Sequence, residues 1–282
     1  MRDFADRIKR LLVGRPVPSG ALGETLLPKR IALPVFASDA LSSVGYAPDE
    51  VLITLAVAGV AATSLSPWVA LAVVGVLAVV VASYRQTVHA YPSGGGDYEV
   101  VSANLGSHAG LLVASALLSD YVLTVAVSVS SGTSYLAAAL PALVPYKVEI
   151  AVAVVTVLAV LNMRGSRESG RAFAIPTYLY MGVIGIMAVV GLVQELTGTL
   201  GRAESAGFDV VTHAGWEQGL TGLAGGFLVL RAFSSGCAAL TGVEAISNGV
   251  PSFQRPKSRN AATTLLLLGG IAALMLMSVI HL

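Results

Sequence analysis

The chain alternates between long apolar runs and short polar stretches. Each run approaches the roughly 20 residues that an α-helix needs to cross the hydrocarbon core of a bilayer. The pattern predicts seven spans, of which the third is long enough to be strongly tilted and the fourth is short. The predicted spans cover residues 32–59, 67–84, 108–139, 148–162, 172–196, 222–250 and 260–282.

Composition supports a membrane protein made of helices. Of the 282 residues, 55% are hydrophobic and 12% are charged, whereas soluble domains carry about 25% charged residues. Cys237 is the single cysteine, so an intramolecular disulfide is excluded. We therefore expect an all-α membrane protein in which residues 31–282 form the transmembrane domain.

The first 30 residues form a basic segment with a different composition. Phe4, Ile8, Leu11 and Leu12 recur at helical spacing among lysines and arginines. This pattern fits a short amphipathic helix on the membrane surface. A disordered basic tail fits equally well, and the sequence leaves both open.

The distribution of lysine and arginine predicts the orientation. With the N-terminus in the cytoplasm, cytoplasmic segments hold 14 of the 17 basic residues, while Lys147 and Arg202 lie outside and Arg231 falls inside the sixth span. Cytoplasmic loops of membrane proteins carry an excess of these residues. We therefore expect a multi-pass protein of the cell (plasma) membrane with a cytoplasmic N-terminus.

The first and sixth spans contain helix-breaking residues. Gly45 and Pro48 interrupt the first span, and Gly236, Gly242 and Gly249 interrupt the sixth. Broken spans in corresponding positions of two repeats indicate a transporter built from inverted repeats. The spacing predicts a 5+5 inverted-repeat fold with broken helices 1 and 6, in which 32–196 is the first repeat and 222–282 begins the second.

Three acidic residues are predicted to lie deep in the bilayer: Asp39, Asp120 and Glu244. A charge at that depth costs on the order of 2.5–3.5 kcal/mol on insertion scales, so each is a candidate functional residue. Steps of four from Asp120 reach Thr124 and Ser128, which form one polar stripe on a helix.

Further oxygen-bearing side chains accompany these acids. Tyr121 follows Asp120, Tyr46 lies two helical turns after Asp39, and Thr241 precedes Glu244 by three residues. Carboxylate, hydroxyl and freed carbonyl oxygens suit hard cations. Without a His/Cys cluster, the sequence argues against a zinc or redox-metal site.

Structural explanations compete with a binding site. Serine and threonine in membrane helices often bond backbone carbonyls or join helices, and Arg231 could form an ion pair with one of the acids. The hydroxyl residues fit the structural explanation well. The carboxylates fit it poorly, because burying a charge merely to join helices is costly.

The sequence resembles the APC superfamily of transporters, and most closely its KUP/KimA-type proton-coupled potassium importers. The resemblance is carried by ASDALSSVGYAPDE, YRQTVHAYPSGGGDYEVVSANLG, SDYVLTVAVSVSSG and GCAALTGVEAISNGVPSF. It implies the broken-helix, LeuT/APC-type fold and a secondary active transporter that imports potassium by alternating access, not an enzyme. It further implies a set of potassium ligands: Asp39, Tyr46, Asp120, Tyr121, Thr124, Ser128, Thr241 and Glu244.

The resemblance also implies how the ions are coupled. Glu244 or Asp120 would carry the co-transported proton, and K⁺ and H⁺ would be transported ions, with no cofactor. The expected partners are the lipid bilayer and the potassium ion, with a homodimer left open and no nucleic acid. Importers of this type have more spans and a soluble C-terminal domain, so the chain is expected to be a truncated version.

Two other functions remain open at this point. An amino-acid or polyamine permease of the same superfamily would use the same fold, and an organic cation could use the same carboxylates. However, a carboxylate in each broken span would repel the carboxylate of an amino acid. A non-transporting partner or sensor is the remaining hypothesis, although it gives no reason for the polar residues.

Overall fold

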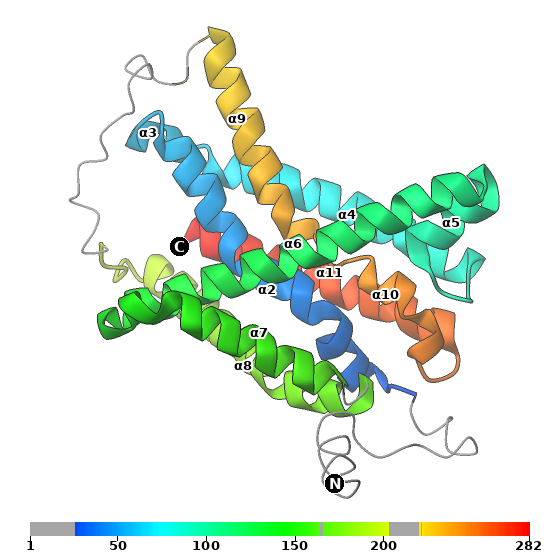
Figure 1. Ribbon diagram of the computed structural model, residues 1–282. Helices are drawn as coiled ribbons and strands as arrows, with labels where there is room; N and C mark the ends of the chain where they lie inside the picture. The colour runs from blue at the N-terminus through cyan, green and yellow to red at the C-terminus, as the bar shows by residue number, and fades with distance from the viewer. Residues whose placement is uncertain (1–25, 164–165, 203–219, 221) are drawn as a thin grey trace, which may run out of the picture. The chain divides into compact units, whose positions relative to one another are not determined.

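The structure is a computed structural model, and it describes residues 26–163, 166–202, 220 and 222–282, which are nearly all helical (Figure 1). The predicted amphipathic helix in the basic tail lies outside the described residues. The elements are α2 (Lys29–Ala56), α3 (Val60–Thr63), α4 (Ser66–Ala90), α5 (Gly96–Leu105), α6 (Ser107–Ala139), η2 (Pro141–Tyr146), α7 (Lys147–Met163), α8 (Ser166–Leu196), α9 (Gly222–Gly236), η4 (Cys237–Leu240), α10 (Ala245–Asn248), η5 (Val250–Ser252) and α11 (Lys257–His281).

Each of the seven predicted spans corresponds to helix in the structure, and six segments are long and apolar enough to cross a membrane. The first predicted span, α2, is not among the six, although its 28 residues give it a length of about 42 Å. Its charged and polar residues lower its hydropathy, as expected for a helix that carries part of a polar site.

The predicted break in the first span is wrong, because α2 is one continuous α-helix from Lys29 to Ala56. Pro48 removes only the hydrogen bond that its own nitrogen would donate, and membrane helices tolerate such a loss. Gly45 does not interrupt the helix, and its small size matters for packing instead. A Cβ atom there would lie 2.7 Å from the Tyr180 hydroxyl of α8, so glycine makes room for that side chain.

The predicted break in the sixth span is confirmed. The helix α9 ends at Gly236, a 3₁₀ turn follows, and residues 241–244 form a turn before the short helix α10. Gly242 has a φ of 79°, a left-handed conformation that glycine adopts without a steric cost. Glu244 therefore lies where the helix is interrupted.

The chain divides into two compact units, each of which is described by itself. Unit 1 comprises Met1–Asp39, Tyr84–Thr177 and Glu244–Leu265. Unit 2 comprises Ala40–Ser83, Tyr178–Val243 and Leu266–Leu282. Both units contain part of α2 and part of the broken sixth span.

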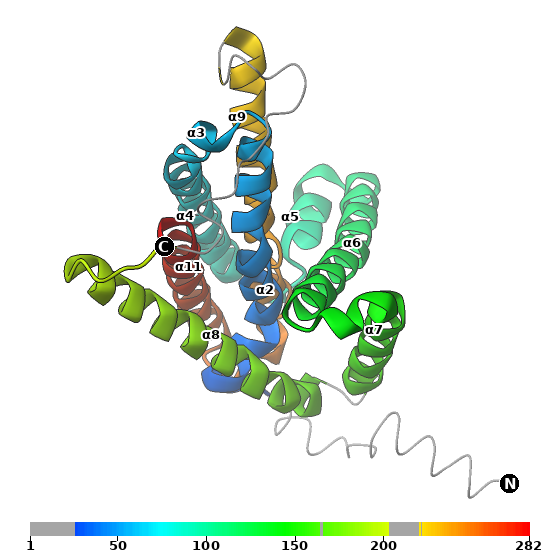
Figure 2. The same ribbon diagram turned by 90° about the vertical axis from the view of Figure 1, so that its left-hand side faces the viewer.

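In unit 1, the N-terminal part of α2 packs against the segment that follows α10. Leu27 donates its backbone N–H to the carbonyl of Ser252 at 2.8 Å, and the rings of Phe36 and Phe253 stack with centroids 5.4 Å apart. Gly249 contacts Phe36, and a Cβ atom would not fit there. In the same unit, α6 packs against α5 and α7 (Figure 2).

In unit 2, the C-terminal part of α2 packs against α9. Val51 and Leu55 of α2 share a buried apolar cluster with Leu228 and Ala232 of α9. Gly236 permits the close approach, since a Cβ atom there would lie 2.9 Å from a methyl group of Val51. The first and sixth spans are thus neighbours in each unit, as expected for corresponding helices of two repeats.

Replacing Gly236 by leucine should destabilise this packing. The new side chain would meet Val51 at 2.9 Å and Val73 at 3.1 Å, and overpacking of this kind costs about 1–3 kcal/mol. We expect a lower melting temperature of the purified protein in detergent.

Gly226→Leu provides the matched control on the same helix. A Cβ atom at Gly226 would have nothing within 4 Å, so this change should leave the melting temperature unchanged or raise it slightly. Equal effects of the two substitutions would contradict the predicted close contact at Gly236.

Candidate cation site

Unit 1 brings together the three acids that the sequence singles out. Asp39 lies on α2, Asp120 on α6, and Glu244 in the turn before α10. Asp39 interacts electrostatically with Asp120, and Glu244 interacts with both. Since like charges repel at short range, a cation bound among them would relieve the repulsion.

Glu244 has the most unusual environment of the three acids. Its side chain is 8% exposed, and its Oε1 atom is buried without a hydrogen-bond partner. Within the described part of the chain, two other buried side-chain oxygens share this condition, Ser128 Oγ and Ser102 Oγ. Leaving such a group unpaired costs free energy, so an unpaired carboxylate oxygen is the kind of group a cation or a proton would satisfy.

The polar stripe on α6 has the geometry that its spacing predicts. The helix is continuous through Asp120, Thr124 and Ser128, so these residues lie on one face. Thr124 is buried, and Ser128 contributes one of the unpaired oxygens. The stripe therefore adds hydroxyl oxygens to the carboxylates of unit 1.

The three acids are not arranged as a complete set of metal ligands. Among the residues that the structure describes, no three His, Cys, Asp or Glu side chains are arranged to hold one metal ion. A cation in this region would therefore be held by fewer than three carboxylates, with hydroxyl or carbonyl oxygens completing its coordination. Such a site suits a weakly held ion better than a permanently bound one.

The hydroxyl of Tyr121 already has a protein partner. The side-chain amide of Asn248, at the end of α10, donates a hydrogen bond of 2.8 Å to this hydroxyl. Asn248 also donates its backbone N–H to the carbonyl of Glu244 at 2.9 Å. Asn248 thus links α6 to the residue with the unpaired carboxylate oxygen, a role that sequence reasoning missed.

The triple-glycine turn packs against the same asparagine. Gly96 has a φ of 47°, and a Cβ atom there would collide with the side-chain oxygen of Asn248. The helix after this turn is α5, with Asp97 in its first turn. The hydroxyl of Tyr84 donates a 2.8 Å hydrogen bond to Asp97, which anchors the turn to the end of α4.

The two remaining predicted residues, Tyr46 and Thr241, belong to a hydroxyl cluster in unit 2. The oxygen of Ser43 lies 3.0 Å from the Tyr46 hydroxyl and 2.8 Å from the Thr241 hydroxyl. Thr241 also donates to the carbonyl of Ala238 at 2.8 Å. These hydroxyls are thus paired within the protein, which agrees with the structural explanation of membrane threonines. Sequence reasoning missed Ser43, although it lies one turn before Tyr46.

Arg231 does not have the environment of a buried ion-pair partner. It is exposed on α9. The structure therefore does not support an ion pair between Arg231 and one of the three acids.

The fold and the site define a multi-pass membrane protein with an interrupted helix and a cluster of deep acids. The family model for amino acid permeases matches residues 35–282. The match covers most of the chain, and the protein therefore belongs to the amino acid permease family.

Two relatives whose names refer to potassium transport are similar to this chain in sequence. The chain is 44% identical over 268 residues to "Potassium transporter KimA" of Bacillus subtilis (strain 168), an alignment that covers 95% of this chain and 43% of the relative. It is 32% identical over 137 residues to "Probable potassium transport system protein Kup 1" of Bradyrhizobium sp. (strain ORS 278), which covers 49% of this chain and 20% of that relative. The chain thus spans less than half the length of the relatives it matches.

A double-mutant cycle on Asn248 and Tyr121 tests the contact that fixes α10. Asn248→Ala and Tyr121→Phe should each lower the free energy of unfolding by about 0.5–1.5 kcal/mol, the usual value of one hydrogen bond. Because both remove the same bond, the double variant should lose little more than either single variant. Denaturant unfolding in detergent measures the free energy of unfolding of the wild type, the two single variants and the double variant.

Asn248→Ala combined with Tyr98→Phe is the control cycle, since Tyr98 is exposed on α5 and the side-chain amide of Asn248 is bonded to Tyr121 instead. The control effects should add. Additive effects for the Asn248–Tyr121 pair as well would show that the hydrogen bond does not stabilise the protein.

Proposed function

We propose that this chain is part of a secondary active transporter that imports potassium, coupled to protons, by alternating access. The observation that carries the proposal is the buried, unpaired Oε1 atom of Glu244, beside which Asp39 and Asp120 add negative charge. The names of the two relatives, both potassium transporters, support the choice of ion.

The proposed ion site lies among the acids of unit 1. A potassium ion entering it would exchange part of its hydration shell for a Glu244 oxygen and for oxygens of the α6 stripe, including Ser128. The turn at residues 241–244 frees backbone groups from the helix, and transporters use such interrupted helices to coordinate cations. Asp39 and Asp120 would favour a cation through their charge, whether or not they touch it.

Tyr121 is proposed as a further ligand of the site in unit 1, whereas Tyr46 and Thr241 remain expectations from the sequence and belong to the hydroxyl cluster of unit 2. Each has a hydrogen-bond partner within the protein: Ser43 for Tyr46 and Thr241, and Asn248 for Tyr121. Hydroxyl oxygens can coordinate in addition to such a bond, so the Tyr121 hydroxyl can contribute to the site only through its remaining lone pair.

Glu244 is also the proposed carrier of the proton. A carboxylate oxygen without a protein partner can be neutralised by K⁺ or by H⁺, and alternation between the two would couple their movements. Asp120, the other candidate from the sequence, has no such unpaired buried oxygen in the described structure. Of the two acids, we therefore propose Glu244 as the proton carrier.

The orientation is proposed from charge. The excess of lysine and arginine on one side of the predicted spans favours a cytoplasmic N-terminus in the plasma membrane.

An organic-cation permease is the second candidate, because the matching family model is described as an amino acid permease. The carboxylates of Asp39, Asp120 and Glu244 could bind a basic amino acid or a polyamine. They would, however, repel the carboxylate of an amino acid, which favours an inorganic cation.

Neutralising the acids tests the ion site. Glu244→Gln should lower ⁸⁶Rb⁺ uptake by the intact protein at least tenfold, because the amide keeps the shape but cannot supply the charge. It should also remove the dependence of uptake on a proton gradient. Asp39→Asn and Asp120→Asn should weaken uptake less, through the apparent affinity for rubidium.

Glu149→Gln is the matched control, since Glu149 is an exposed carboxylate in the first turn of α7. Protein levels in the membrane should be equal for all variants. Wild-type uptake in Glu244→Gln, Asp39→Asn and Asp120→Asn would refute the proposed ion site.

Competition distinguishes potassium from organic cations. Unlabelled potassium should displace ⁸⁶Rb⁺ from the intact protein, whereas arginine and putrescine at the same concentration should not. Displacement by arginine or putrescine would favour the permease alternative.

A further inference from the structure

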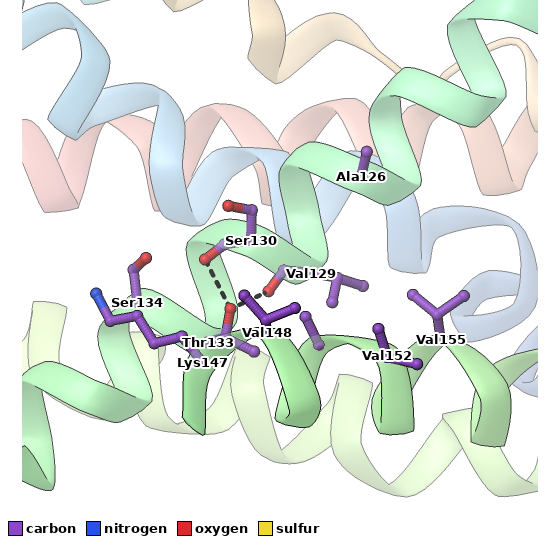
Figure 3. A pocket seen from close by; sticks show the side chains of 10 residues that line it. Ala126, Val129, Ser130, Thr133, Ser134, Lys147, Val148, Val152 and Val155 are labelled. Atoms are coloured by element: carbon purple, nitrogen blue, oxygen red, sulfur yellow. Dashed lines mark hydrogen bonds between the residues drawn. The ribbon is translucent and has the colours of Figure 1, made fainter. Parts of the chain in front are cut away.

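A groove between α6 and α7 lies apart from the acids of unit 1. Its volume is about 290 Å³. In Figure 3, both helices line it along their length, and α7 contributes a row of valines. The lining residues are Ala126, Val129, Ser130, Thr133 and Ser134 of α6 and Lys147, Val148, Ala151, Val152 and Val155 of α7.

The groove occupies a different face of α6 from the polar stripe. At 3.6 residues per turn, the residues that line the groove are centred about 150° around the helix from Asp120, Thr124 and Ser128. The groove is therefore not an extension of the candidate cation site.

The groove has a polar end and an apolar end. Lys147 and Ser134 lie together at one end, while Val155 and Ala126 lie at the other (Figure 3). The hydroxyl of Thr133 is satisfied by the carbonyls of Val129 and Ser130, both at 2.9 Å. Lys147, Ser130 and Ser134 therefore provide the polar groups with which an occupant could pair.

The size of the groove matches part of a lipid. Lys147 and Val155 are eight residues apart on α7, which corresponds to about 12 Å along the helix. One leaflet contributes about 15 Å of the hydrocarbon core. An acyl chain lying along Val148, Val152 and Val155 would thus remain within one leaflet, with its headgroup near Lys147.

We propose that the groove binds an anionic phospholipid, with its phosphate at Lys147 and one acyl chain along the valines of α7. Both helices belong to segments that are long and apolar enough to span a membrane, and the valines named are exposed. An apolar protein helix in the groove would bury the Lys147 ammonium group without a partner, which is costly. A phosphate pairs with that charge.

Other charges near Lys147 do not cancel it. Glu149 lies in the same first turn of α7 and is exposed. Residues two apart on a helix do not face each other, and Glu149 is not among the residues that line the groove. The positive charge at the polar end of the groove is therefore available to an anion.

Native mass spectrometry of the intact protein tests the proposal. The probes are phosphatidylglycerol and phosphatidylcholine with identical acyl chains. The wild type should retain phosphatidylglycerol preferentially, and Lys147→Gln should reduce that preference about fivefold, the usual effect of one basic residue near anionic lipid. Val152→Trp fills the groove and should reduce retention of both lipids.

Two matched controls separate this site from general effects. Arg202→Gln removes one positive charge outside the groove, and Val157→Trp adds the same bulk on the opposite face of α7. Both should bind lipid like the wild type. An unchanged lipid preference in Lys147→Gln would overturn the proposal.

A photo-crosslinking residue at position 152 identifies the occupant directly. Crosslinks to phospholipid are expected in membranes that contain phosphatidylglycerol. A protein adduct in place of a lipid adduct would show that a polypeptide covers the groove, and would also overturn the proposal.

Discussion

Burying the carboxylate of Glu244 in a membrane-spanning segment costs free energy that no described protein group offsets at its Oε1 atom. The nearby charges of Asp39 and Asp120 increase this cost instead of reducing it. Under the proposed function, a bound cation or a proton would supply the missing interaction, and the same residue would alternate between an ion-loaded and a proton-loaded form.

The position of Glu244 depends on the local breakdown of the helix around it. Gly242, with its positive φ, allows the chain to leave the helix after η4 and to start α10 three residues later. Asn248 then ties α10 to Tyr121 on α6, and Gly96 leaves room for this asparagine. The cation site thus depends on two positions, 242 and 96, where a larger residue would not fit the backbone conformation.

Much of the architecture could be predicted from the sequence. The apolar runs placed the ends of the helices to within six residues, since span length is set by the bilayer. The residues Asp39, Asp120 and Glu244 stood out because acids are rare at that depth, and the structure places all three in unit 1. Local signals also predicted the break in the sixth span.

What the sequence could not reveal were contacts between distant segments. Gly45 resembled a helix break, yet it makes room for Tyr180, a residue more than 130 positions away. Ser43 and Asn248 carry ordinary side chains whose importance comes from their partners. The spacing of Tyr46 and Thr241 suggested ligands, whereas their hydroxyls pair through Ser43. Pairing of this kind is fixed by tertiary packing, which periodicity along one helix does not encode.

The helix α6 contributes residues both to the candidate cation site and to the α6–α7 groove. One face of α6 presents Asp120 and hydroxyls, and another lines a groove whose opposite side is formed by the valines of α7 and Lys147. The most direct test of the central claim is a crystal structure of the intact protein in rubidium, with the ion located by its anomalous scattering. We predict a peak with an oxygen of Glu244 in its coordination shell, which disappears in Glu244→Gln. A rubidium peak elsewhere in the membrane-spanning region, unaffected by that substitution, would contradict the claim.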